Sequence, residues 1–217
     1  MSMICWVLGL TPTQIGALQA TPSLTRKLTS VAMDDQYQAQ IDEAIKRMSP
    51  EQKKRFEASR SDARPGMKEW QAHLAEARQW IAPLGPFEPA LGLEKSWHML
   101  HYLFTGHVGT TRAPGDLLLT GEEVGEDVGY GPARLHGPTE TREFGRFLET
   151  QDLSRLQARV SLQEMNRLRV YGMPMGAGSD AEHEKGLRDD VGFYFPRLRD
   201  YVARMSSKGD GLLVCVS

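Results

Sequence analysis

Cysteine and long hydrophobic runs are both scarce in this sequence. Only two cysteines, Cys5 and Cys215, occur among 217 residues, too few for the disulfide framework of a small secreted protein. No apolar stretch approaches the roughly 18 residues of a membrane-spanning helix. The apolar N-terminus lacks the basic start of a signal peptide and runs into Thr11 and Pro12, which are typical of a helix start. We therefore expect a cytoplasmic protein with no membrane partner.

An excess of charge of one sign is also missing. The chain has 26 Lys and Arg against 28 Asp and Glu, which gives a net charge of −2. Without a general basic field to hold phosphate groups, we expect no nucleic-acid partner. The hydrophobic fraction of 40% and the charged fraction of 25% are those of an ordinary globular chain. A length of this order predicts one domain over residues 1–217.

The common signatures of catalysis are absent as well. The sequence contains no Gly-x-Ser-x-Gly elbow. The segment Gly129-Tyr130-Gly131-Pro132 has neither the preceding strand and following helix of a dinucleotide-binding loop nor the Lys-Ser/Thr ending of a P-loop. Both cysteines lie in apolar runs, where a thiol is a poor nucleophile. We therefore expect no cofactor and no metal, and leave open whether the protein is an enzyme.

Apolar runs at the two ends of the chain predict strands. Residues 3–8 and 211–216 are almost continuously apolar, as in strands that are covered on both faces. We expect both strands in one sheet. Two interpretations of Cys5 and Cys215 follow: they are neighbouring thiols or, as we favour, two small buried side chains in a reducing compartment.

Helical spacing of apolar residues dominates the rest of the sequence. The segments with this spacing cover residues 34–48, 66–82, 93–106, 139–149 and 187–205, while residues 117–119 and 133–136 have the pattern of short strands. In the helix over 66–82, one apolar face contains Trp70, Leu74, Ala77 and Ile81. The sequence thus predicts an α+β fold, with a small mixed sheet that includes both terminal strands and is packed with many helices.

The predicted helix over residues 93–106 contains the tightest pair of histidines, His98 and His101. Its apolar stripe includes Trp97, and a second, polar line is formed by Glu94, His98, His101 and Thr105. Three interpretations remain open for the histidines. They are satisfied buried groups, they contact a ligand, or they bind a metal, although no cluster supplies the further ligands that zinc requires.

Two segments concentrate charge of opposite sign. Residues 121–127 form an acidic connector with Glu122, Glu123, Glu126 and Asp127, which is either an exposed loop or a recognition surface for a basic partner. Paired carboxylates of this kind also suit acid and base catalysis. Residues 46–64 are basic, as in a solvated helical face or a phosphate-binding patch.

Four segments, taken together, resemble the YfbM-like family of bacterial proteins, a family of unknown function. They are residues 3–7, 93–106, 121–134 and 201–216. The resemblance implies a single bacterial cytoplasmic α+β domain without an assigned activity, in which the helical section at about 34–88 is longer than in shorter members. The resemblance implies that recurring positions of the family correspond to these residues of the chain: Lys95, Trp97, His101, Thr105, Gly106, Gly129, Tyr130, Gly131 and Pro132. They suggest a shared cleft.

Two hypotheses about function follow. The first is a non-catalytic protein-binding domain, such as an immunity-type protein that neutralises a toxin or effector with a basic surface. The alternative is a small-ligand-binding protein or hydrolase-like enzyme that uses a cleft of His, Glu, Tyr and Arg side chains. The candidate cleft residues are Glu94, Trp97, His98, His101, Glu122, Glu123, Asp127, Tyr130 and Arg134.

Overall fold

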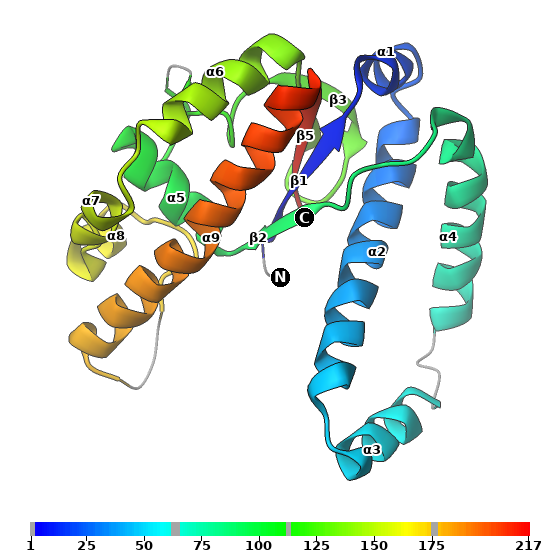
Figure 1. The fold of residues 1–217 in the computed structure, drawn as a ribbon, viewed down its shortest axis with the longest axis horizontal. Helices are drawn as coiled ribbons and strands as arrows, with labels where there is room; N and C mark the ends of the chain where they lie inside the picture. The colour runs from blue at the N-terminus through cyan, green and yellow to red at the C-terminus, as the bar shows by residue number, and fades with distance from the viewer. Residues whose placement is uncertain (1–2, 62–65, 112–113, 175–177) are drawn as a thin grey trace.

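The protein is built on one antiparallel sheet, seen in the computed structural model, which describes residues 3–61, 66–111, 114–174 and 178–217. The strands, in the order in which they lie in the sheet, are β2 (Leu91–Glu94), β1 (Cys5–Leu10), β5 (Gly211–Val216), β4 (Pro132–His136) and β3 (Glu122–Asp127). The α+β class is confirmed, and the two terminal strands lie side by side at the centre (Figure 1). All strand pairs of the described residues are antiparallel, so the sheet is not mixed.

Helices cover both faces of this sheet. The helices that pack on one face or extend beyond it are α1 (Pro12–Ala20), α2 (Leu24–Arg47), α3 (Pro50–Ser61) and α4 (Met67–Ile81). The other face carries α5 (Ser96–Thr105), α6 (Pro138–Glu149), α7 (Leu153–Ala158), α8 (Leu162–Arg167) and α9 (Asp180–Lys208). Figure 1 shows α2 and α4 side by side, with α3 at their far end. Each face has its own hydrophobic core.

The central strands β1 and β5 are buried on both faces, which explains their continuous apolar sequences. Because side chains alternate along a strand, Cys5 packs in the core beneath α9 and Cys215 in the core beneath α2. The two thiols therefore project from opposite faces, and both are free and buried. Burial raises the pKa of Cys215 to about 12. The interpretation of two small buried side chains is confirmed.

Two predicted segments differ from the structure near the candidate site residues. The helix expected over 93–106 begins only at Ser96, because the preceding residues form β2 and pair with the edge of β1. Glu94 ends that strand with φ of 48° and does not share a helical face with His98. The acidic connector over 121–127 is the edge strand β3, paired with β4. Both segments are short strands whose partners lie far away in the sequence, so local spacing does not reveal them.

The structure confirms one helix start predicted from the sequence and differs from the predictions in other segments. Thr11 caps α1 as expected, through a capping box with Gln14. Ser179 and Glu182 form a second capping box that starts α9 at Asp180, seven residues before the helix predicted from residue 187. Residues 117–119 lie in turns and not in a strand. Trp70 continues the apolar face of α4, yet 43% of its surface is exposed.

A close approach between backbones occurs where β5 begins. A Cβ atom added at Gly211 would lie 2.3 Å from the backbone oxygen of His136 and 2.5 Å from Cδ1 of Ile15. The missing side chain thus lets β5, β4 and α1 come together at one end of the sheet. By contrast, a Cβ at Gly16, inside α1, would meet no atom within 4 Å.

We predict that Gly211→Ala lowers the free energy of unfolding by about 1–3 kcal/mol, because the new methyl group overpacks the junction and displaces backbone. Urea denaturation monitored by circular dichroism measures this change. The matched control Gly16→Ala should leave stability unchanged or raise it by up to about 1 kcal/mol through better helix propensity. Equal stabilities of the two variants would contradict the predicted clash.

The histidine that ends β4 is enclosed at the same junction. Only 4% of the surface of His136 is exposed, and burial lowers its pKa to about 4. The nearby carboxylate of Glu140 and the carbonyl groups of Leu117 and Thr120 raise this pKa but do not outweigh burial. The ring is therefore neutral in the folded protein at neutral pH.

Because His136 is buried and neutral, we predict that the free energy of unfolding falls at acidic pH. Between pH 6.5 and about 4, the unfolded chain binds a proton at His136 that the folded chain does not. The contribution to stability is complete above pH 6.5 and falls by up to about 3 kcal/mol as the pH decreases to 4. Urea denaturation between pH 4.5 and 7.5 should show a steeper acid loss for the wild type than for His136→Gln. Parallel pH profiles would contradict this assignment.

Candidate functional site

His98, one of the two histidines of α5, has both ring nitrogens hydrogen-bonded to backbone groups. Nε2 of His98 lies 2.8 Å from the carbonyl oxygen of Val108, and Nδ1 accepts the backbone N–H of Tyr171 at 2.7 Å. This arrangement places the ring proton on Nε2. Burial lowers the pKa of His98, so the neutral ring joins two segments of backbone. Neither nitrogen is available to accept a proton from a substrate.

His101 forms a buried pair with Asp116. Both side chains have no exposed surface, and Nδ1 of His101 lies 3.3 Å from Oδ1 of Asp116. Nε2 of the same ring lies 3.0 Å from the carbonyl oxygen of Gly109, while Asp116 also accepts the backbone N–H of Thr111. Burial lowers the pKa of His101, whereas the nearby Asp116 raises it. The pair therefore fastens the segment that follows α5 to the helix.

The sheet divides the candidate residues into two groups. Trp97 is buried and stacks on His98 with ring centroids 4.9 Å apart, so it belongs with the histidines. Glu94 lies on β2, at one edge of the sheet, and the acidic residues lie on β3, at the other. Three strands separate these edges, which corresponds to about 19 Å at the usual strand spacing. The structure brings together Glu122, Glu123, Asp127, Tyr130 and Arg134, but not the histidines or Glu94 with them.

Four exposed carboxylates lie along the edge strand β3. We call these residues the acidic strip: Glu122, Glu123, Glu126 and Asp127. Two of its members have cationic neighbours. Glu123 lies 3.5 Å from Arg134 on β4, and Glu126 lies 3.6 Å from Arg26 on α2. Both pairs are mainly exposed, so solvent screens them and they stabilise the fold little. The strip keeps more negative than positive charge.

The turn after β3 is held rigidly by its own polar groups. Asp127 accepts the backbone N–H groups of Gly129 at 2.7 Å and Gly131 at 3.0 Å, which lowers its pKa. The backbone N–H of Tyr130 donates to the carbonyl oxygen of Val216 at 3.0 Å. Gly129 has φ of 148°, and a Cβ there would lie 2.6 Å from Cα of Ser217. The glycines therefore let the turn close over the end of β5.

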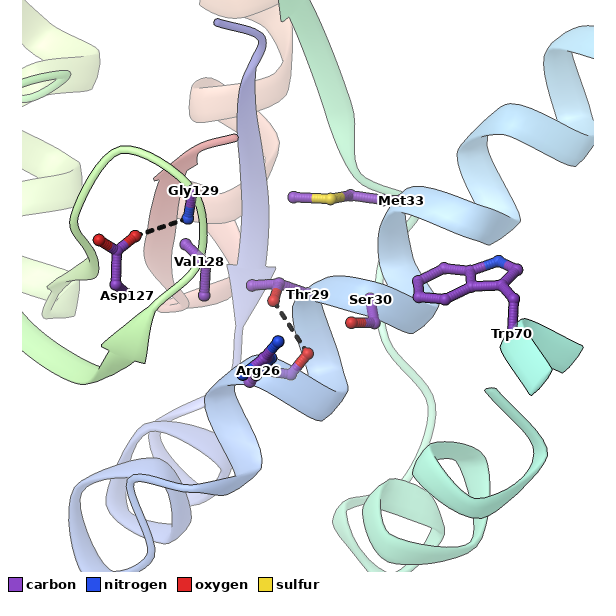
Figure 2. A pocket seen from close by; sticks show the side chains of 8 residues that line it. All are labelled: Arg26, Thr29, Ser30, Met33, Trp70, Asp127, Val128 and Gly129. Atoms are coloured by element: carbon purple, nitrogen blue, oxygen red, sulfur yellow. Dashed lines mark hydrogen bonds between the residues drawn. The ribbon is translucent and has the colours of Figure 1, made fainter. Parts of the chain in front are cut away.

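An open cleft lies at the Asp127 end of the acidic strip. Figure 2 shows it between the turn after β3 and the helices α2 and α4. Its volume is about 470 Å³, and its lining residues are Arg26, Thr29, Ser30, Met33, Trp70, Asp127, Val128 and Gly129. Sequence reasoning missed Arg26 and Met33 and assigned Trp70 to the core. The apolar spacing of α4 shows which of its faces is apolar, but not how far neighbouring elements cover that face.

A second hollow lies at the Glu122 end of the strip. It has a volume of about 300 Å³ and is lined by Ile15, Gln19, Gly121, Glu122, Leu135, His136, Gly137 and Glu140. The amide of Gln19 donates to Glu122 at 2.8 Å. Sequence reasoning missed His136 and Glu140, because they meet Glu122 only through strand pairing and the start of α6. The acidic strip thus has a concave surface at each end.

The described parts of the chain contain neither a metal-binding cluster nor a membrane-spanning helix. No group of three or more His, Cys, Asp or Glu side chains in those parts is arranged to hold a metal ion. None of the described helices is long and apolar enough to cross a membrane.

Comparison with known proteins identifies the family of the chain and its fold. A solved structure titled as a protein of unknown function, YfbM from Escherichia coli, matches with a TM-score of 0.57 and 18% sequence identity, covering 99% of each chain. At that identity the likeness concerns the fold alone. No curated protein matches the chain. Residues 1–215 match the domain of unknown function DUF1877. The chain therefore belongs to the DUF1877 family.

Proposed function

We propose that this protein is a non-catalytic protein-binding domain of the immunity type, whose partner is a toxin or effector with a basic surface. The observation that carries the proposal is the acidic strip, which places four exposed carboxylates along one edge of the sheet. A concentrated charge of one sign attracts and orients a partner of the opposite sign. The partner would contact the strip through Lys and Arg side chains.

The surroundings of the strip support binding through side chains. The outer edge of β3 has no neighbouring strand in the described sheet, and its carboxylates oppose the addition of another strand. Exposed aromatic residues stand near the Asp127 end, with Trp70 43% and Tyr130 42% exposed. Trp and Tyr are the residue types that most often anchor protein interfaces. Charge and aromatic anchors therefore occur on the same part of the surface.

The enzyme alternative has less support. A histidine that acts as general base needs a nitrogen within reach of substrate. His98 has both nitrogens bonded to backbone, and His101 has no exposed surface. Neither histidine lines the two hollows beside the acidic strip. The free, buried cysteines also fit the reducing cytoplasm that we propose as the location.

Charge removal on the strip tests the proposal. Tagged wild type and the variant Glu123→Gln/Glu126→Gln are used to capture proteins from a lysate of the source bacterium, with quantification by mass spectrometry. We predict that one basic protein is recovered at a near-stoichiometric level by the wild type, and at least about fivefold less by the variant, since two of the attracting charges are lost. Recovery should also fall when the salt concentration rises.

The matched control is Glu143→Gln/Glu149→Gln, which removes the same charge from exposed positions on α6. This control should capture the partner as the wild type does. A partner that is lost equally from both variants, or retained equally by both, would contradict the strip as the binding surface. Absence of any stoichiometric partner would contradict the protein-binding function itself.

A further inference from the structure

The hollow at the Glu122 end of the strip contains carboxylates without a cationic neighbour. Glu122 enters from β3 and Glu140 from the first turn of α6. Within the described residues, neither side chain forms an ion pair, whereas Glu123 and Glu126 are paired with arginines. The polar contact of Glu122 is the neutral amide of Gln19. Two negative charges thus face one concave space, and none of the residues that line it carries a positive charge.

The wall of the same hollow contains a buried polar atom without a partner. Nε2 of His136 makes no hydrogen bond, although 96% of the side chain is buried. The ring edge that carries this atom is directed at Gly121, where an added Cβ would lie 2.7 Å from Cε1 and 2.8 Å from Nε2. Gly121 also lines the hollow. Because the ring is neutral at neutral pH, it adds no positive charge that would compete with a cationic ligand.

These groups define the chemistry of a ligand. Carboxylates accept hydrogen bonds and do not donate them, so the hollow favours a cation with several donors. The described residues contain no set of three side chains that could hold a metal ion, which favours an organic cation. A guanidinium group has five donors in a planar fork and can bind two carboxylates that approach from different directions, whereas an ammonium group acts as a point charge. A volume of about 300 Å³ admits one long side chain.

We propose that this hollow binds the guanidinium group of an arginine side chain, held between Glu122 and Glu140. The inference rests on the proposed function, since the arginine would belong to the basic partner that contacts the acidic strip. The hollow would then fix the position of the partner at one end of the strip. The more distant carboxylates of the strip would contribute attraction without a defined geometry.

A titration with a small probe tests the hollow without the partner. ¹H–¹⁵N NMR spectra of the full chain are recorded with N-acetyl-arginine amide, with the lysine analogue, and with the neutral citrulline analogue. We expect saturable shifts of the Gly121 and Gly137 amides with the arginine probe, weaker shifts with the lysine probe and none with the citrulline probe. No saturable shift at these amides, or equal shifts with citrulline, would overturn the proposal.

The variant Glu140→Gln should weaken arginine binding at least about fivefold, since one of the two carboxylates is lost. Glutamine keeps the size of the side chain, and a thermal melt confirms folding. Glu143→Gln, one turn away and exposed, is the control and should bind as the wild type does. Unchanged binding by Glu140→Gln would overturn the assignment of the site.

Capture of the natural partner separates this inference from the proposed function. If Glu123→Gln/Glu126→Gln loses the partner while Glu140→Gln retains it and the probe does not bind, the arginine site is wrong and protein binding stands. If the probe binds but no partner is captured, the hollow recognises guanidinium and the protein-binding function is wrong. Loss of both the probe and the partner in Glu140→Gln supports the complete proposal.

Discussion

The pairing of the first strand with the last is the interaction on which the rest of the structure depends. β1 and β5 lie at the centre of the sheet, and their side chains form parts of both hydrophobic cores. Hydrophobic burial on two faces makes this pair the natural centre of stability. A close approach at one end of β5 accompanies this pairing, because Gly211 has no side chain at the point where β5, β4 and α1 meet. All other strands and helices are placed relative to this pair.

The position of each strand in the sheet decides which chemical groups reach solvent. β3 is the last strand of the sheet. Four of its six residues are acidic, and the edge position leaves them exposed. The histidines lie on a helix within the core opposite α2, where backbone groups bind both nitrogens of His98 and Nε2 of His101, and Nδ1 of His101 lies 3.3 Å from Asp116. Burial lowers the pKa of both rings. Groups with catalytic potential thus connect parts of the fold, and the recognition surface that we propose lies at the edge of the sheet.

The net charge of −2 conceals this distribution. Within the acidic strip, arginines stand beside Glu123 and Glu126, but neutral groups surround Glu122 and Glu140 at the nearby hollow. Opposite charges that lie side by side partly cancel, whereas like charges that share a concave space without a counter-ion add their fields. The same distinction explains why a total of charges says little about a partner. In the function that we propose, recognition depends on which carboxylates the fold leaves without a cation.

The sequence by itself determined the α+β class, the two terminal strands, the capped start of α1 and the buried, free state of both cysteines. These features depend on local periodicity, capping residues and apolar content, which are all readable along the chain. Tertiary structure alone decided that Glu94 lies in a strand, that residues 122–127 form an edge, and that Glu140 and His136 meet Glu122. Such juxtapositions arise from pairing between distant segments, and no local pattern encodes them because the partner strand supplies the hydrogen bonds and the burial.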